Sequence, residues 1–521
     1  MTGLFDGVLN HGPLGPLTDD SAWLQALLDA EAALARALVV SGHVTDRQAE
    51  TIAAACQVDR FDPAALGRAA EDGGNPVIPL VKQLTAHVHE TDPEAARHVH
   101  RGATSQDIMD TAAMLLVRRA GRALHTEMCA LTTDLHGLAD HHRTTPMPGR
   151  TLLQQALPTT FGAVAAGWAA GLTGAAERLE DVLTHHLAAQ LGGAVGTLAS
   201  LESQAPPEPH SSSEALAPQE SPATHGAPPP PRTRASPGSP ALAVAAAFAE
   251  RLGLPEPLLP WHTERGRVTE IAAALGRVCG AVGTTAQDVV LLTQTEVGEL
   301  TEEGGGGVGG SSTMPHKRNP VAAVSALAAA RQAPGLVATL FAAQIQEHQR
   351  AAGAWHAEWL PLTDLLRRTG SAVSWLRVSV QRLRVHPDRM RANLDLTRGL
   401  ALSERLTTDL APELGRLEAH RRVTDACREA VDQGRDPVEV LAEHLRVLRT
   451  RERISALLDP ADYLGAAPVF TDRVTGRTGQ AGPTGTAASR AGTFAGPTGT
   501  ETGPADTATG PNDTEEGTDE R

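Results

Sequence analysis

The chain has 521 residues and a formal net charge of −16. It is long enough to bury more than one core, and its acidity argues against general binding to nucleic acid or anionic membranes. Only 3% of the residues are aromatic, which favours helix over sheet. Four scattered cysteines without a CxxC pair argue against a disulfide framework and fit a reducing compartment. We see no signal peptide and no apolar run of about 18 residues, so we expect a cytoplasmic protein without membrane or nucleic-acid partners.

Helical periodicity runs through most of the first 470 residues. Residues 21–41 place apolar side chains at steps of three and four, directly after N-cap candidates at 19–21. The same period recurs over residues 107–125, 241–254 and 268–300. The last of these has small and apolar residues around much of its circumference, as a helix buried between other helices has. No alternation of strands and helices is visible, so the predicted fold class is all-α.

Two segments interrupt this pattern. Residues 204–240 hold eleven prolines in 37 residues, cannot form a helix and have little to bury, so we predict a disordered loop. Residues 475–521 consist mainly of glycine, threonine, proline, alanine and acidic residues, which predicts a disordered tail. Helical periodicity resumes directly after the first break. This favours an insertion within a domain over the alternative, a linker between two independent domains.

Residues 304–320 read GGGGVGGSSTMPHKRNP and contain a GxGxxG match over 304–309. The match is weak, because a dinucleotide site needs a strand before the glycines and we predict that 297–303 is the end of a helix. A Walker P-loop needs GK[ST], which this stretch lacks. The remaining alternative from composition is a flexible surface loop.

The residues after the glycines offer chemistry that a plain linker would not need. Ser311 and Ser312 supply hydroxyls beside backbone amides, Lys317 is a point cation and Asn319 is a neutral double donor. Such donors suit a carboxylate, or the enolate formed when a proton leaves the carbon next to a carboxylate. A serine held among them can act as a base, and the glycines would let the loop close over a ligand.

Three stretches together resemble one enzyme superfamily. GSSTMPHKRNP (310–320) resembles the GSSxMPxKxNP loop of the fumarase/aspartase superfamily, which includes argininosuccinate and adenylosuccinate lyases. HVHRGATSQDIMDTA (98–112) is similar to its first shared region and PGRTLLQQALPTTFG (148–162) to its second, in the same chain order. The resemblance covers about residues 1–470 apart from the proline-rich insertion.

The expected architecture has three helical domains, with long helices bundled in the middle one. We expect an N-terminal domain over 1–112, a central bundle over 113–363 and a C-terminal domain over 364–474, before the tail at 475–521. The resemblance also implies a homotetramer in which each active site takes its three shared regions from three subunits.

Further stretches are similar to one branch, the 3-carboxy-cis,cis-muconate cycloisomerases. They are GNPVIPLVKQL (74–84), GGAVGTLASL (192–201), LPWHTERGR (259–267), QEHQRAAGAWHAEW (346–359) and LLDPADYLGAA (457–467). This resemblance implies cofactor-independent lactonisation of a polycarboxylate diene in protocatechuate catabolism, the β-ketoadipate pathway. Leu152 stands where amine-releasing lyases carry a histidine that protonates the leaving nitrogen, and lactonisation needs no such acid.

The resemblance also implies roles for individual residues. Ser311 is the expected proton-transfer group, with Ser312 as second candidate, while Lys317 and Asn319 polarise the carboxylate beside the transferred proton. The other expected substrate-binding residues are His100, Arg101, Thr104, Ser105, Gln155, Met314, His348 and Arg350. One departure from the branch is WHTERGR at 261–267, where an acid appears at Glu264 and one is missing at Gly266.

Two other functions remain open. The first is a superfamily lyase that releases fumarate from a substituted succinate of the adenylosuccinate or nitrosuccinate type. Leu152 weighs less against a leaving group that departs without protonation. The second is a non-catalytic binding or structural homologue. We expect no metal site, because the closely spaced histidines lack a carboxylate or cysteine to complete a ligand set.

Overall fold

The computed structural model describes residues 3–202, 239–304, 309, 314 and 317–477. Most of the predicted insertion at 204–240 and of the predicted tail at 475–521 therefore lies outside the described residues. The first helices are α1 (Asp6–Leu9), α2 (Asp20–Ala37), α3 (Asp46–Ala55), α4 (Pro63–Gly73), α5 (Val77–Thr91) and α6 (Pro93–Ala96), with a 3-10 turn η1 (Val58–Arg60). The α2 helix starts where predicted, because the Asp19 side chain accepts a hydrogen bond from Ala22 N, but it ends four residues before the predicted end at 41.

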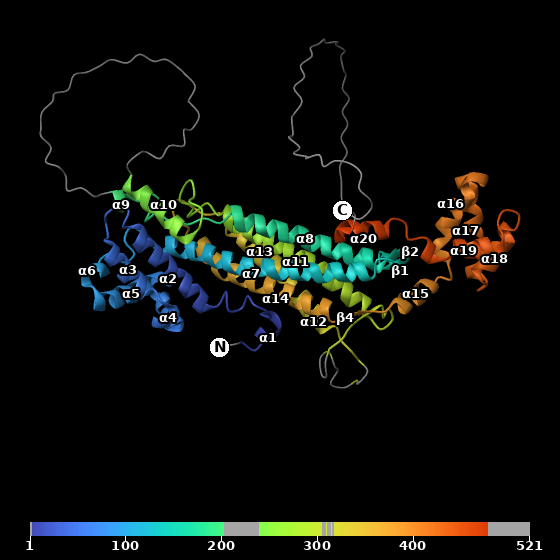
Figure 1. The fold of residues 1–521 in the computed structure, drawn as a ribbon, viewed down its shortest axis with the longest axis horizontal. Helices are drawn as coiled ribbons and strands as arrows, with labels where there is room; N and C mark the ends of the chain where they lie inside the picture. The colour runs from blue at the N-terminus through green and yellow to red at the C-terminus, as the bar shows by residue number, and fades with distance from the viewer. Residues whose placement is uncertain (1–2, 203–238, 305–308, 310–313, 315–316, 478–521) are drawn as a thin grey trace, which may run out of the picture. The chain divides into compact units, whose positions relative to one another are not determined.

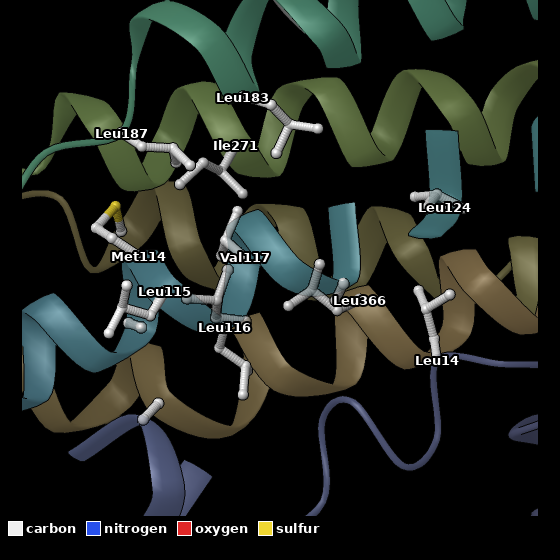
Figure 2. Packing of buried hydrophobic residues seen from close by; sticks show 14 of the residues in the cluster. Leu14, Met114, Leu115, Leu116, Val117, Leu124, Leu183, Leu187, Ile271 and Leu366 are labelled. Atoms are coloured by element: carbon white, nitrogen blue, oxygen red, sulfur yellow. The ribbon is translucent and has the colours of Figure 1, made fainter. Parts of the chain in front are cut away.

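Long helices form the centre of the chain (Figure 1). They are α7 (Ser105–His141), α8 (Phe161–His185), α11 (Gly266–Leu292) and α14 (Ala354–Gln381), accompanied by α9 (Ala199–Glu202), α10 (Pro240–Leu252), α12 (Val321–Ala330) and α13 (Ala333–Ala342). The α7 helix packs against α2, α8 and α14, and α11 packs against α8, α12 and α14. Figure 2 shows part of this core, where Leu116 and Val117 of α7 lie among Leu183, Ile271 and Leu366 of the neighbouring helices. The all-α prediction is confirmed.

The predicted helix over 268–300 is wrong at its C-terminal end, as is the helix end predicted over 297–303. The α11 helix stops at Leu292, and Leu300–Glu302 forms strand β3. Gly298, six residues after the helix ends, takes a left-handed φ of +61° and turns the chain just before β3. The next residue, Glu299, is buried and accepts hydrogen bonds from Arg150 and Asn393, so long-range pairing overrides the local helical period.

The strands form two small antiparallel sheets. In one, β1 (Pro146–Thr151) pairs with β2 (Gln154–Thr160), and in the other β3 pairs with β4 (Leu383–Val385). Leu152 and Leu153 form the tight turn of the β1–β2 hairpin with φ values of +51° and +65°. Although β3 precedes the glycine-rich stretch, no parallel βαβ unit occurs in the described part of the chain, so the GxGxxG match lacks the fold of a dinucleotide site.

Most of the remaining helices pack around a second apolar cluster, and the last one packs against the central bundle. They are α15 (Pro387–Asp395), α16 (Ser403–Leu414), α17 (Arg416–Asp432), α18 (Pro437–Leu445), α19 (Arg451–Leu457) and α20 (Ala467–Thr475), with 3-10 turns η2 (Leu400–Leu402) and η3 (Pro460–Asp462). Buried side chains from Leu402 to Leu458 form a cluster separate from the main core. The α20 helix packs on α8 and α7, and Arg143 pairs with Asp472. The predicted domain boundaries stay a prediction.

One stretch departs from the expectation that no segment could span a membrane. Within the described ranges, residues 321–342 are long and apolar enough to do so by length and composition. Of the most apolar 18-residue window in this stretch, 39% is buried in the folded chain. The stretch comprises α12 and α13, which pack on α11 and α14 and are separated at Arg331 and Gln332.

Candidate active site

The first shared region lies at the N-terminus of α7. Ser105 is the first residue of the helix, and the backbone N–H of Thr104 donates to Asp107 Oδ2 at 2.9 Å. His100 precedes them with a φ of +60°, a left-handed conformation that costs a non-glycine residue about 1 kcal/mol. Arg101 follows and contacts the His98 ring at 3.2 Å. Four of the predicted binding residues therefore lie within one short segment.

Asp107 connects this segment to two others, and sequence reasoning missed it. Its side chain is fully buried and accepts hydrogen bonds from the backbone N–H groups of Gly192 and Gly193 at 2.9 Å and from His262 Nε2 at 2.6 Å, besides that from Thr104. A carboxylate with four hydrogen-bond donors is strongly held, and it fixes the positions of the chain segments that carry the donors. Asp107 thus attaches the 192–201 and 259–267 stretches to the start of α7.

The predicted residues His348 and Arg350 lie in the same neighbourhood. Arg350 Nη2 donates to Gly193 O at 2.6 Å, and the His348 carbonyl accepts from Thr263 Oγ1 at 3.0 Å. Burial lowers the pKa of the Arg350 guanidinium from its ordinary value, although the carboxylates of Asp107 and Asp110 act in the opposite direction. His348 is exposed and has a φ of +53°.

A buried ionic network around Arg265 lies next to these residues and holds them in place. Arg265 donates to Asp110 Oδ2 at 2.8 Å and to Glu358 Oε2 at 2.5 Å, and all three side chains are at most 4% exposed. Trp355 Nε1 also donates to Asp110, and Gln346 Nε2 donates to Glu358 at 2.8 Å. Gln346 is four residues from Arg350, so the network holds the segment that carries His348 and Arg350.

Burial disfavours the charged forms within this network, and ion pairing outweighs burial for Arg265 but not for Glu358. Burial lowers the pKa of Arg265, but Asp110 and Glu358 outweigh that effect and raise it. Burial raises the pKa of the Glu358 carboxyl, an effect that Arg265 only partly offsets. The signal for this network was present in the sequence, since Asp107 and Asp110 are three residues apart just before the apolar run 112–117, and buried charges must be paired.

The acid that departs from the branch pattern has a structural contact. Glu264 is exposed, and its Oε1 accepts a hydrogen bond from Gly266 N at 2.9 Å, at the start of α11. A carboxylate at that position stabilises the free N–H groups of a helix N-terminus.

The second shared region is distant from this cluster within one protomer. Gln155 lies on β2 opposite Arg150, in the hairpin that follows the C-terminus of α7. The α7 helix has 37 residues. A helix of that length spans about 55 Å, so Thr104 at its start and Gln155 beyond its end do not share a site in one chain. Leu152, at the tip of the hairpin, is 97% exposed.

The third shared region begins after β3. Gly309 has a φ of +74°, and its carbonyl accepts hydrogen bonds from Asn319 N at 2.9 Å and Asn319 Nδ2 at 3.3 Å. A Cβ at Gly309 would lie 2.6 Å from Asn319 O, so this position requires glycine. Met314 and Lys317 are exposed, and the Met314 carbonyl accepts from Lys317 N at 3.1 Å. Ser311 and Ser312 lie outside the described residues.

The structure thus brings His100, Arg101, Thr104, Ser105, His348 and Arg350 together, and holds Gln155 elsewhere. A separate cavity of about 260 Å³ lies between α2, α4, α5 and α14. Its lining is mainly apolar, with Trp23, Leu27 and Trp359 among the walls, and does not suit a substrate of several negative charges. In the described part of the chain, no three His, Cys, Asp or Glu side chains group to hold a metal ion.

Comparison with known proteins places the chain in a family. The family model described as Lyase matches residues 17–217 and 239–335, and the model described as Adenylosuccinate lyase C-terminus matches 399–474. The chain is 43% identical over 472 residues to a 3-carboxy-cis,cis-muconate cycloisomerase of Pseudomonas aeruginosa, covering 90% of this chain and 95% of that protein. It is 42% identical over 490 residues to a nitrosuccinate lyase of Streptomyces davaonensis, covering 94% and 97%.

Solved structures agree with these relatives. The 3-carboxy-cis,cis-muconate lactonizing enzyme of Pseudomonas putida superposes with a TM-score of 0.79 at 40% identity, covering 91% of this chain and 98% of that one. Both the lyase model and these similarities extend over most of the chain, across the segments that form the site. The chain is an enzyme of the lyase family and belongs to the fumarase/aspartase superfamily.

Proposed function

We propose that the protein lactonises 3-carboxy-cis,cis-muconate to carboxymuconolactone without a cofactor, in protocatechuate catabolism by the β-ketoadipate pathway. The observation that carries this proposal is the combination of a cluster around the start of α7 that contains Arg101, Arg350 and His100 with Leu152 at the histidine position of the amine-releasing lyases. A substrate with three carboxylates needs the cations, and a ring closure within one molecule releases no amine that would need an acid. The named cycloisomerases among the relatives support the same reaction.

The proposed reaction converts the substrate trianion and one proton into the dianion of the lactone. A carboxylate oxygen of the substrate forms a bond to a carbon of the diene, and the displaced π electrons move onto the neighbouring carboxylate as an enolate. The enolate then takes up a proton at its α-carbon from the Ser311 hydroxyl, which regains a proton from water. Nothing is oxidised and no group leaves. In this proposal Ser311 transfers the proton, Lys317 and Asn319 stabilise the enolate, and His100, Thr104 and Ser105 hold a second carboxylate.

A nitrosuccinate lyase is the second candidate, and one specific observation favours it. The Streptomyces enzyme of that name is as similar to this chain as the cycloisomerases are. In that reaction Ser311 would work in the opposite direction, as a base that removes a proton from the carbon beside a carboxylate. Nitrite leaves with the electron pair of the broken C–N bond, which gives fumarate. Nitrite departs without protonation, so Leu152 is compatible with this reaction as well.

A substrate panel on purified protein distinguishes the two candidates. With EDTA present, we expect rapid loss of the diene absorbance of 3-carboxy-cis,cis-muconate and no fumarate from nitrosuccinate, adenylosuccinate or argininosuccinate. Fumarate from nitrosuccinate with the diene untouched would replace the first candidate by the second. Loss of activity in EDTA, restored by a divalent metal, would contradict a metal-independent reaction.

We further propose that the protein is a cytoplasmic homotetramer whose sites are shared between subunits. One protomer separates its first and second shared regions by the length of α7, about 55 Å. The hairpin tip also exposes two leucines in left-handed conformations, which is an unfavourable surface for a lone protomer in water. A neighbouring copy that receives this hairpin accounts for both features.

Mixing two inactive variants tests the shared site. Ser105→Ala lies at the start of α7 and Gln155→Leu lies in the hairpin, and we expect each variant alone to have little activity. If the regions come from different subunits, random co-assembly restores about a quarter of the sites, because a site then needs an intact copy of each region from two chains. Activity after co-expression that stays at the level of the single variants would show that both regions act within one chain.

A further inference from the structure

Glu31 and His100 form a contact that the proposed reaction does not yet use. Glu31 lies on α2, and its side chain is 1% exposed. Glu31 Oε1 is 2.6 Å from His100 Nδ1, in a segment 69 residues further along the chain. Glu31 Oε2 is buried without a hydrogen-bond partner. A carboxylate buried in this way is costly unless its charge is balanced, and His100 is its partner in the described structure.

His100 is held in an uncommon conformation at the candidate site. Its φ of +60° is unusual for a residue with a side chain, and it lies four residues before Thr104. The ring is partly accessible, with 18% of the side chain exposed. Since Nδ1 faces Glu31 and no hydrogen bond to Nε2 occurs among the described residues, Nε2 remains available to a ligand.

The charged groups around the ring favour its protonated form. Burial lowers the pKa of His100, but Glu31 from α2 and Asp107 from α7 outweigh burial and raise the pKa above 6.5. Arg101, the next residue, is directed to His98, and Arg350 lies beside Gly193. With Nδ1–H donated to Glu31, a protonated ring presents Nε2–H as a charged donor.

We propose that Glu31 is a positioning residue that orients His100 so that its Nε2–H binds a substrate carboxylate at the start of α7. The inference rests on the proposed polycarboxylate substrate and adds a residue outside the three shared regions to the site. Glu31 itself does not touch the substrate. It acts through the tautomer, charge and orientation of the His100 ring, in the way that carboxylates behind histidines orient them elsewhere.

The decisive variant is Glu31→Gln, which keeps the shape and an acceptor for Nδ1–H but removes the charge. A charge-assisted hydrogen bond to the substrate weakens when the ring is neutral, so we expect KM to rise about tenfold while kcat changes little. The alkaline limb of kcat/KM, where His100 loses its proton, should move to lower pH. The ratio of wild-type to variant kcat/KM should therefore increase as pH rises into the alkaline limb.

Two comparisons separate positioning from mere structural support. Glu429→Gln makes the same change in another Glu–His pair, where Glu429 Oε2 is 2.8 Å from His444 Nε2. This pair lies outside the candidate site, so the pH profile should stay unchanged. The double variant Glu31→Gln/His100→Asn should have the same KM as His100→Asn alone, because Glu31 acts only through the ring. A double variant whose KM exceeds that of His100→Asn would overturn the proposal. So would a Glu31→Gln variant that melts at a lower temperature but keeps the wild-type alkaline limb.

A measurement without substrate keeps this test independent of the reaction. Deuterium exchange at the imidazole C2 position, followed by mass spectrometry in wild type and Glu31→Gln, reports the protonation of His100 directly. We expect the His100 titration to move to lower pH in the variant and those of the other histidines to stay. If wild type turns over none of the panel substrates, the proposed function fails. An unmoved His100 titration overturns the role of Glu31 whatever the substrate is.

Discussion

Ser311→Ala should lower kcat by about 10³-fold and leave the fold intact, because a positioned proton-transfer group contributes a factor of that order. The substitution removes one oxygen, so circular dichroism, melting temperature and elution volume should match those of wild type. KM should change little, since Lys317 and Asn319, the groups proposed to hold the carboxylate, remain. Steady-state kinetics on whichever substrate the panel identifies measures this loss.

Ser312→Ala is the matched control for Ser311→Ala. The two serines are neighbours in the same loop, so a general disturbance of the loop would affect both variants equally. We expect Ser312→Ala to retain most of the activity. If Ser312→Ala is the inactive variant, the proton-transfer role moves by one residue. If both variants keep substantial activity, the base lies outside this loop.

Arg265→Met should be the most destabilising substitution near the site. It leaves Asp110 and Glu358 buried without their common cation, and breaking a buried ion pair from one side costs about 3–5 kcal/mol of unfolding free energy. Activity should fall with stability, because Gln346 and its neighbours His348 and Arg350 lose their anchor. Thermal and chemical denaturation, with activity measured well below the melting temperature, separate the two effects.

The pH dependence of this defect has a definite sign. The folded-state pKa of Glu358 lies above its ordinary value, so the folded protein takes up a proton as pH falls, before the unfolded chain does. Stability contributed by this group therefore increases as pH falls from that folded-state pKa towards 4.5. Without Arg265 the Glu358 carboxyl takes up a proton more readily in the folded protein. The loss of unfolding free energy in Arg265→Met relative to wild type should therefore be smaller at pH 5.5 than at pH 8.

An exposed arginine with two acidic partners provides the control. Arg421 pairs with Glu418 and Asp425 on the surface of α17. Solvent screens such pairs, so Arg421→Met should not measurably change the melting temperature. Adding Asp110→Asn and Glu358→Gln to Arg265→Met should recover part of the loss, because the unpaired charges are then gone. Equal melting temperatures for Arg265→Met and Arg421→Met would refute a supporting role for the network.

Four helices were located from the sequence, because the information that specifies them is local. The period of three and four identified α2, α7, α10 and α11, and Asp19 marked the start of α2 through its cap. The same rule failed at 293–302. There Gly298 and the buried Glu299, which pairs with Arg150 149 residues earlier, redirect the chain into β3. A periodicity read over neighbouring residues cannot reveal a partner that is so distant in the sequence.

The features of the candidate site also separate into those that local sequence predicts and those that depend on tertiary contacts. The sequence by itself determined the superfamily and the all-α fold, because the loop at 310–320 and the segments at 98–112 and 148–162 are contiguous motifs. For the chemistry it supplied candidate residues, whose roles stay a prediction. Only the tertiary structure decided which of them meet. Asp107, the Arg265 network and the Glu31–His100 contact join residues separated by 69 to 155 positions, and burial of charge enforces those pairings after the helices have packed.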